Sequence, residues 1–164
     1  MVGTLLYPLN SLKDREPELW RREVAKYKGR EQVLEKPVPP LGCLWNDVLH
    51  LSTVHPSLVA AELEAVGLEL PKKAFYELDP GALDPERTVI FLNRRFEVSS
   101  ASDESQWLPF DSANLAGLAG VNDSTRRYYR ESAARGQRPL LYGSLPHVLF
   151  RGALETLGWP MYEV

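Results

Sequence analysis

Side chains that can act as nucleophiles, proton carriers or ligands gather in one short stretch of the chain. It holds the single cysteine, Cys43, and two of the three histidines, His50 and His55. Neutral histidine exchanges a proton near neutral pH and hydrogen-bonds hydroxyl groups. If residues 47–54 form a strand, His50 and Ser52 project from one face about 7 Å apart. They are therefore the first candidates for a catalytic or ligand-binding pair.

The secondary structure of residues 43–54 is ambiguous. A helix would bring Cys43, Asp47 and His50 onto one face at i, i+4 and i+7, which is a set of metal-ligand types. We favour a strand over residues 47–54, because Val, Leu and Thr crowd this run and because a residue that precedes proline prefers extended geometry. The strand interpretation predicts no metal site.

The cysteine is expected to be a buried structural residue. A thiolate nucleophile needs a lowered pKa, from a helix N-terminus or a nearby imidazole. The order Gly42, Cys43, Trp45 differs from the papain-type signature, although His147 follows far along the chain. A lone cysteine between large apolar residues usually packs as a small hydrophobe.

The motif Val48-Leu49-His50-Leu51-Ser52, followed by a helix that ends at Gly67-Leu68, resembles the opening of ADP-ribosyltransferase-like enzymes, which include RNA 2′-phosphotransferases. In that family a His-x-Thr/Ser motif on a strand holds the ribose of NAD. The resemblance covers about 21 residues, 48–68. It implies that His50 binds the ribose and that Ser52 takes the adjacent role.

The same resemblance implies two further groups. Family members place an aromatic ring under the nicotinamide, for which Tyr76 and Tyr142 are the candidates. They often use a late glutamate to stabilise the developing oxocarbenium ion, and Glu155 is the candidate for that role. Neither group stands in a matching family motif.

A second set of candidate binding residues lies in the basic stretch 125–135. Guanidinium groups next to aromatic rings suit phosphates, nucleotides or a single nucleic-acid strand. A solvated helix face with tyrosines packed beneath it fits the same pattern, and the negative charge of the whole chain favours this second interpretation. The residues are Arg126, Arg127 and Arg130, interleaved with Tyr128 and Tyr129.

Length and composition limit the class of protein. The 164 residues suffice for one hydrophobic core, so we expect a single globular domain over 1–164. A net charge of −3 argues against a general nucleic-acid coat protein. Because there is no signal segment in residues 1–9 and no run near the ~20 apolar residues of a membrane span, we expect a cytoplasmic protein. The excess of Arg over Lys and the proline-rich loops also fit a thermophile.

Helices and strands are interleaved at irregular spacing, which favours an α+β fold with a mixed or mostly antiparallel sheet and several packed helices. Residues 99–105, SSASDES, are expected to form a mobile loop, and residues 147–151 are a strand or part of a helix over 146–157. Helices are predicted near 14–28, 56–66 and 125–135, and a further short helix is predicted that Asp111 or Ser112 caps and that Gly117 and Gly120 keep short. The other strands are predicted near 4–7, 32–38, 72–78, 88–92, 140–142 and 160–164.

Two functions fit these features. We favour a domain without a cofactor that binds a small ligand or a protein partner, with a homodimer as one form it could take. The alternative is an NAD-using enzyme with His50 and Ser52 in the NAD site. An open cleft where an aromatic ring and a carboxylate converge on His50 would favour the enzyme. The candidate ligand-binding residues are His50, Ser52, His55, Tyr142, Arg126, Arg127 and Arg130.

Overall fold

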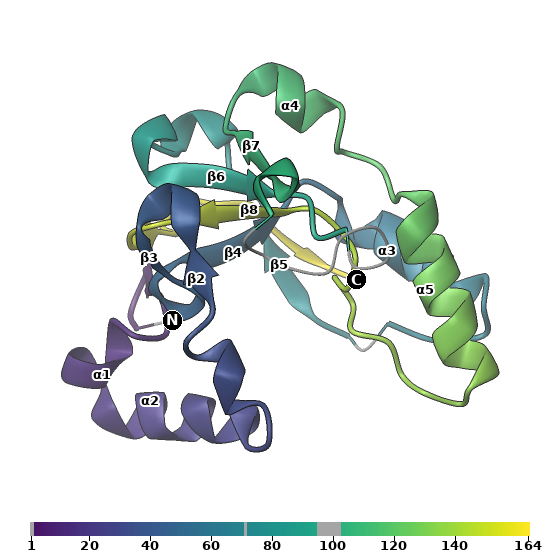
Figure 1. The fold of residues 1–164 in the computed structure, drawn as a ribbon, viewed down its shortest axis with the longest axis horizontal. Helices are drawn as coiled ribbons and strands as arrows, with labels where there is room; N and C mark the ends of the chain where they lie inside the picture. Colours follow the sequence, from purple (N-terminus) through teal and green to yellow (C-terminus); the bar gives the residue numbers. More distant parts are fainter. Residues whose placement is uncertain (1, 71, 95–102) are drawn as a thin grey trace.

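A four-stranded antiparallel sheet forms the centre of the molecule (Figure 1). The computed structural model describes residues 2–70, 72–94 and 103–164. Strand β6 (Thr88–Phe91) is an internal strand that is covered on both faces, and all of its residues are buried. Its Thr-Val-Ile-Phe sequence predicts this burial. In spatial order the strands are β4 (Leu49–Ser52), β8 (His147–Phe150), β6 (Thr88–Phe91) and β7 (Trp107–Pro109).

Three two-stranded antiparallel sheets surround this centre. Two of them join segments that are far apart in the sequence, which no local pattern predicts. The predicted α+β class with mostly antiparallel pairing is confirmed. The pairs are β1 (Leu5–Leu6) with β9 (Leu154–Glu155), β2 (Pro37–Val38) with β3 (Cys43–Leu44), and β5 (Ala74–Tyr76) with β10 (Met161–Glu163).

One of the longer helices begins at Pro56, as the sequence predicts, and another begins at Asp123, just before its predicted start at 125. The Asn122 side chain accepts a hydrogen bond from the Thr125 N–H (2.7 Å), and Pro56 occupies the first turn of the preceding long helix. The helix predicted over 14–28 is instead broken, because Pro17 cannot continue the first segment. No helix in the described part of the chain is long and apolar enough to cross a membrane. The helices are α1 (Leu12–Arg15), α2 (Pro17–Val24), α3 (Pro56–Glu64), α4 (Ser112–Ala116) and α5 (Asp123–Ala134).

Short 3₁₀ helices fill several connections, and one of them settles the ambiguous stretch 43–54. There, Trp45–Asp47 forms a 3₁₀ turn between β3 and β4. Asp47 holds this turn by accepting the Leu44 N–H (2.8 Å). The stretch is therefore extended on both sides of one turn. The 3₁₀ helices are Ala25–Tyr27, Glu31–Val33, Pro39–Leu41, Trp45–Asp47, Pro80–Ala82, Pro85–Arg87 and Glu104–Gln106.

Three other predictions meet the structure differently. Residues 147–150 are a strand, which resolves that alternative. The strand predicted over 140–142 is wrong, because the segment turns back and the Gly143 N–H donates to the Leu140 carbonyl (2.9 Å). In the predicted mobile loop, residues 99–102 lie outside the described residues, and the following residues form a 3₁₀ turn that includes Ser105.

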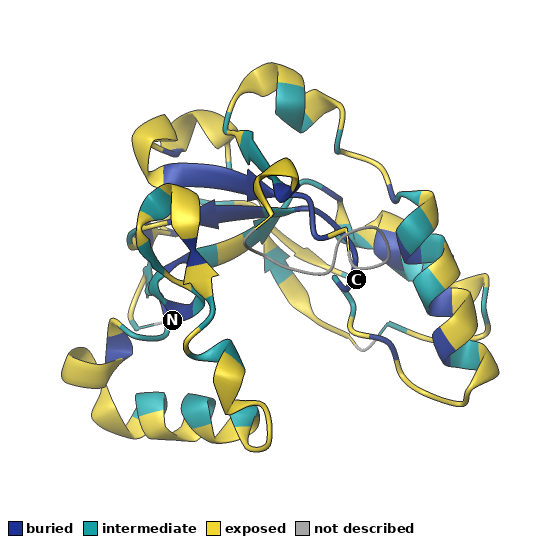
Figure 2. Ribbon diagram, viewed as in Figure 1, coloured by how far each residue is buried: buried dark blue, intermediate teal, exposed yellow. Residues whose placement is uncertain are grey.

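Strands β6 and β8 are largely buried (Figure 2), and apolar side chains pack on both faces of the central sheet. One face packs Val89 and Leu149 against Val38 and Val48. The other face packs Ile90 and its neighbours against Leu83, which precedes β6, and against Leu115 of α4. A separate cluster joins α3 to α5, which lie side by side (Figure 1). The buried sheet is thus a rigid support for side chains along its edge.

Candidate functional site

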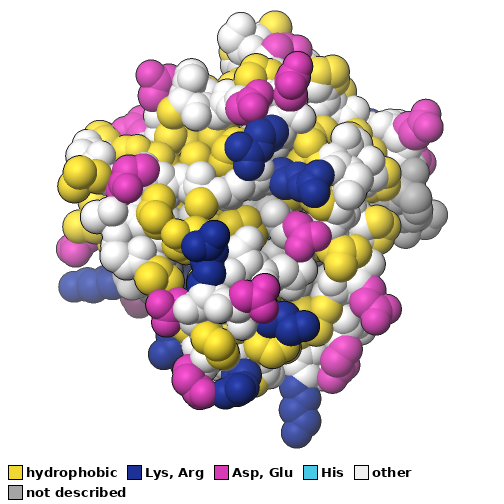
Figure 3. Space-filling model, turned by 90° about the vertical axis from the view of Figure 1, so that its left-hand side faces the viewer, with side chains coloured by type: hydrophobic (Ala, Val, Ile, Leu, Met, Phe, Trp, Pro, Cys, Tyr) yellow, Lys and Arg dark blue, Asp and Glu magenta, His cyan; other side chains and the backbone are white. Residues whose placement is uncertain are grey.

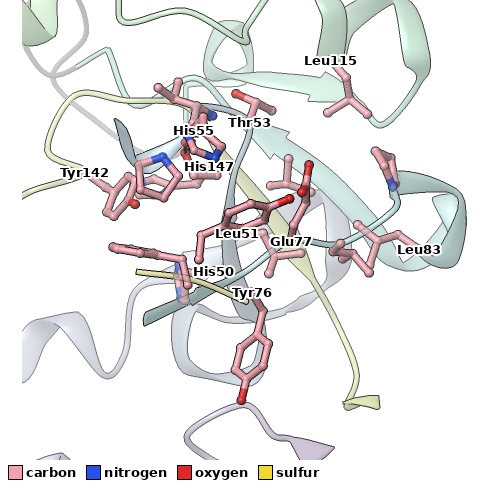
Figure 4. Close-up of a pocket in the computed structure, with 18 of the residues that line it drawn as sticks. His50, Leu51, Thr53, His55, Tyr76, Glu77, Leu83, Leu115, Tyr142 and His147 are labelled. Carbon is pink, nitrogen blue, oxygen red and sulfur yellow. Dashed lines mark hydrogen bonds between the residues drawn. The ribbon is translucent and has the colours of Figure 1, made fainter. Parts of the chain in front are cut away.

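A cavity of about 570 Å³ opens beside β4, and all three histidines of the chain line it (Figure 4). The histidines come from β4, from the residue that precedes α3, and from β8. The face of the molecule in Figure 3 shows no histidine, only a mixture of basic, acidic and apolar side chains. The cavity is therefore where the proton-carrying side chains of this chain meet.

Strand register brings two of the histidines together. Ser52 on β4 lies opposite His147 on β8, and His50 lies two residues earlier on the same face of β4. The imidazole rings of His50 and His147 are 6.1 Å apart in a T-shaped arrangement. The expected pair, His50 and Ser52, does line the cavity, and His147 joins it from the neighbouring strand.

The backbone of β4 also faces the open edge of the sheet. On the far side of β8, the Arg151 N–H donates to the Arg87 carbonyl (2.8 Å), which fixes the alternation of hydrogen bonds between β8 and β6. Because backbone groups point alternately to one side and the other along each antiparallel strand, the N–H and C=O groups of His50 and Ser52 point away from β8 and from the sheet. Because β4 is an edge strand, these groups point toward its open side.

His50 has the geometry of a side chain on the wall of a concave site. Its surface is more than one-third exposed, yet burial among surrounding protein atoms lowers its pKa. The carbonyl of Trp45 opposes this shift, and the charge of Lys36 adds to it. Because that carbonyl lies 2.9 Å from Nε2, we assign the ring proton to Nε2, which leaves Nδ1 as the acceptor.

The Ser52 hydroxyl is partly engaged by its own turn. It accepts a hydrogen bond from the Val54 N–H (3.0 Å) and donates to the Val54 carbonyl (3.3 Å). This local pattern shapes the chain between β4 and α3. Ser52 can offer a ligand its remaining lone pair and its outward backbone groups.

His147 is held in place on two sides. Its ring stacks on Phe91 at 6.5 Å with an interplanar angle of 8°. The amide nitrogen of the buried Asn93 lies 3.4 Å from Nε2 and also donates to the Leu145 carbonyl (3.1 Å). Asn93 adopts a left-handed backbone (φ 54°), which asparagine tolerates better than most residues. The ring orientation of His147 is therefore fixed by the fold.

A carboxylate that the sequence did not single out completes the cavity. Glu77 follows β5, and its hydrogen bond raises the pKa of the Tyr162 hydroxyl on β10. Tyr162 pairs with Phe75 across the β5–β10 ribbon, and Phe75 and Glu77 share one face of it. The ring of His55 lies 5.6 Å from that of Tyr162. The predicted alternation over 72–78 was the available signal for Glu77, but only the pairing with β10 shows where that face points.

The two aromatic candidates differ in orientation. Tyr142 is half-buried, its ring lies 6.5 Å from that of Phe75, and burial raises the pKa of its hydroxyl. Tyr76 belongs to the other face of β5, and its hydroxyl points away from the remaining labelled side chains in Figure 4. Tyr142 is therefore the better placed of the two.

Glu155 does not join the cavity. It lies on β9, where it pairs with Leu5 of β1, and it is not among the residues that line the cavity. This corrects its expected position as the catalytic carboxylate, and the physical reason is the strand pairing that directs it elsewhere. Glu77 is the carboxylate that the fold places there.

The arginine candidates lie on α5 and do not line the cavity. Arg126 forms ion pairs with Glu62 (2.8 Å) and Asp123 (3.1 Å), while Arg127 and Arg130 are exposed. Tyr129, on the other side of α5, is fully buried. This arrangement fits a solvated helix face, and the absence of a nucleic-acid-binding role for these arginines stays a prediction.

Metal and thiol chemistry find little support in the described residues. No group of three His, Cys, Asp or Glu side chains in this part of the chain is arranged to hold a metal ion. Cys43 is half-buried, and burial raises the pKa of its thiol, which disfavours the reactive thiolate.

The chain matches no protein-family model, and no curated protein or solved structure is significantly similar to it. The functional assignment therefore depends on the geometry of the cavity.

Proposed function

We propose that this chain binds a small organic molecule in the histidine cavity, the space lined by His50, His55, His147 and Glu77. One observation carries the proposal: polar side chains from distant segments converge on a single, largely apolar space. Its volume of about 570 Å³ lies within the roughly 300–1,000 Å³ typical of ligand pockets.

The wall of the cavity favours a flat ligand with hydrogen-bonding groups along one edge. Phe75 and Tyr142 supply ring surfaces for stacking. Nδ1 of His50 accepts a hydrogen bond, and the outward N–H and C=O groups of His50 and Ser52 offer donors and acceptors along β4. A ring that carries amide or hydroxyl groups satisfies both surfaces.

NAD is the particular ligand to test, and an NAD-using enzyme is the second candidate function. It is favoured by one specific observation: His50 and Ser52 line an open cavity on which an aromatic ring and a carboxylate converge. In such an enzyme His50 would bind a ribose hydroxyl and Tyr142 would support the planar base. Glu77, in place of Glu155, would stabilise positive charge that develops at the sugar.

Calorimetric titration of the chain with NAD and with a panel of soluble ring amides tests both candidates. Micromolar NAD binding that is lost in a folded His50→Ala variant supports the enzyme. Binding of a ring amide without NAD binding supports the simple binding domain. Arg127→Ala is the matched control, because this exposed side chain lies outside the cavity. The proposal is contradicted if none of the tested compounds binds in a way that depends on His50.

A further inference from the structure

We propose that the histidine cavity selects organic cations, with the positive charge of the ligand held at the Glu77 end. This inference rests on the proposed function, that the cavity binds a small molecule, and it adds the charge class of that molecule. It follows from the charges and the ring surfaces that line the cavity.

Glu77 is the only Asp, Glu, Lys or Arg among the described residues that line the cavity. Among the described residues, the partner that the structure gives Glu77 is Tyr162, which contributes an uncharged hydroxyl. An exposed carboxylate at the rim of an apolar space attracts a cation that enters, although water and salt weaken that attraction.

The histidines supply no opposing charge in the geometry they adopt. Nδ1 of His55 accepts the Ser57 N–H (3.2 Å), so that nitrogen carries no proton. Nε2 of His147 faces the Asn93 amide nitrogen, and it too is an acceptor. Burial lowers the pKa of His50, which disfavours the charged form of its ring. The lining described here is therefore anionic overall.

Aromatic rings line the same cavity as Glu77, and Phe75 and Tyr162 lie on its own face of the β5–β10 ribbon. Phe75 and Tyr142 have centroids 6.5 Å apart at an interplanar angle of 68°, and Tyr162 pairs with Phe75 across the ribbon. The faces of such rings attract cations, with the largest gain for quaternary ammonium and similar weakly hydrated groups. A carboxylate and several rings on the same wall form a binding surface for an organic cation.

Lys36 determines which end of the cavity takes the charge. Its Nζ lies 3.5 Å from the Trp45 ring centroid, and its charge acts on His50 although Lys36 does not line the cavity. A second cation near His50 would be repelled. The cationic group of the ligand is therefore expected beside Glu77, and its neutral hydrogen-bonding groups along β4.

A matched pair of probes tests the inference. The 1-methylnicotinamide cation and neutral 3-methylbenzamide have nearly the same shape and differ in charge. We expect the cation to bind about fivefold to tenfold more tightly, in the range of a cation–π and carboxylate contact at a partly exposed site. Binding is followed through the ring signals of the three histidines, which report the cavity alone.

Glu77→Gln should lower the affinity ratio of the two probes, because glutamine keeps the shape and removes the carboxylate charge while the aromatic rings remain. Glu155→Gln is the control, since this carboxylate lies outside the cavity, and it should leave the ratio unchanged. If Glu77→Gln does not fold, the salt dependence of the wild-type ratio replaces it, and the ratio should fall as salt rises.

The outcomes separate this inference from the proposed function. If the histidine signals give the neutral probe the same affinity as the cation, the inference of charge selection is wrong and the proposal of small-molecule binding stands. If neither probe perturbs them at millimolar concentration, charge selection is overturned for ring amides of this size. The wider panel of compounds then decides the proposed function separately.

Discussion

The histidine cavity and the arginine-bearing face of α5 were both candidate sites, and they differ in how their side chains are brought together. The cavity collects residues from β4, β8, β5 and β10, which are distant in the sequence. The α5 face collects residues that are neighbours in the sequence, and Arg126 there is engaged by Glu62 and Asp123. A dense sequence cluster can thus be a solvated surface, whereas a binding site needs a concave space that distant segments close.

The two regions also divide stability from recognition. The buried side of α5 packs Tyr129 into the cluster shared with α3, and Thr125 on the same helix is equally buried. The cavity keeps His50 and Glu77 accessible. Substitutions on the buried side of α5 should therefore change the free energy of unfolding, whereas substitutions in the cavity should change ligand binding.

The largest effect is expected at Tyr129. Its ring is fully buried, and its hydroxyl donates to the Leu141 carbonyl. Tyr129→Ala should lower the free energy of unfolding by about 3–5 kcal/mol, because it leaves a large void in a closed core. Urea unfolding measures this, with Arg130→Ala on the exposed side of α5 as the control, expected within about 0.5 kcal/mol of wild type. A loss below about 1 kcal/mol for Tyr129→Ala would show that α5 is not a stability element.

A smaller effect is expected from pH, and it should arise in the cavity. The unfolded pKa of histidine is about 6.5, and burial lowers the pKa of His50 in the folded chain. Between these two values the unfolded chain binds more protons, so the free energy of unfolding rises with pH. The contribution is complete above about pH 6.5 and is lost as the pH falls through the folded pKa of His50.

Urea unfolding of wild type and His50→Gln between pH 7 and pH 5 isolates this contribution, because the carboxylates are common to both. The wild-type curve should fall more steeply on acidification. Equal slopes would mean that His50 is as well hydrated in the folded chain as in the unfolded one, which removes it from the cavity wall.

The α5 ion pairs should contribute less than either effect. The Arg126 side chain is 42% exposed, so the surrounding water screens its attraction to Glu62 and Asp123. Arg126→Ala should leave the urea midpoint nearly unchanged at 150 mM salt and should not alter binding in the cavity. A clear loss of stability in Arg126→Ala that disappears at high salt would instead show that these ion pairs hold α3 and α5 together.

The smallest expected effect is on nucleic acid. The exposed Arg127 and Arg130 belong to a chain of net charge −3, so binding of a short oligonucleotide should be negligible at physiological salt. Fluorescence anisotropy with a labelled single strand checks this. A tight, salt-sensitive complex that Arg127→Ala weakens would make the α5 face a binding site and overturn the comparison with the cavity.

Local signals in the sequence predicted the parts of the fold that depend on local chemistry. Pro56 and Asn122 mark helix starts through their own backbone and side-chain bonding, and the run 88–92 is apolar enough to be an internal strand. The same logic placed His50 and Ser52 on one strand face. The break between α1 and α2 was not predicted, because the charge distribution and the apolar spacing both indicated one continuous helix and Pro17 was given too little weight.

The rest of the site depends on long-range pairing. Glu77 reaches the cavity because β5 pairs with β10, at the other end of the chain, and His147 reaches it because β8 lies between β4 and β6. Glu155 was the carboxylate that the sequence indicated, and its pairing with Leu5 places it outside the cavity. The homodimer and the cytoplasmic location stay predictions.

The most direct test of the histidine cavity is nuclear magnetic resonance of the histidine rings during a titration with soluble ring amides. The chain has three histidines, and all of them line the cavity. A bound ligand should shift the Hε1 signals of His50, His55 and His147 together, with one dissociation constant. A ligand that binds the chain, by calorimetry, while all three signals stay in place would contradict the assignment of the cavity as the binding site.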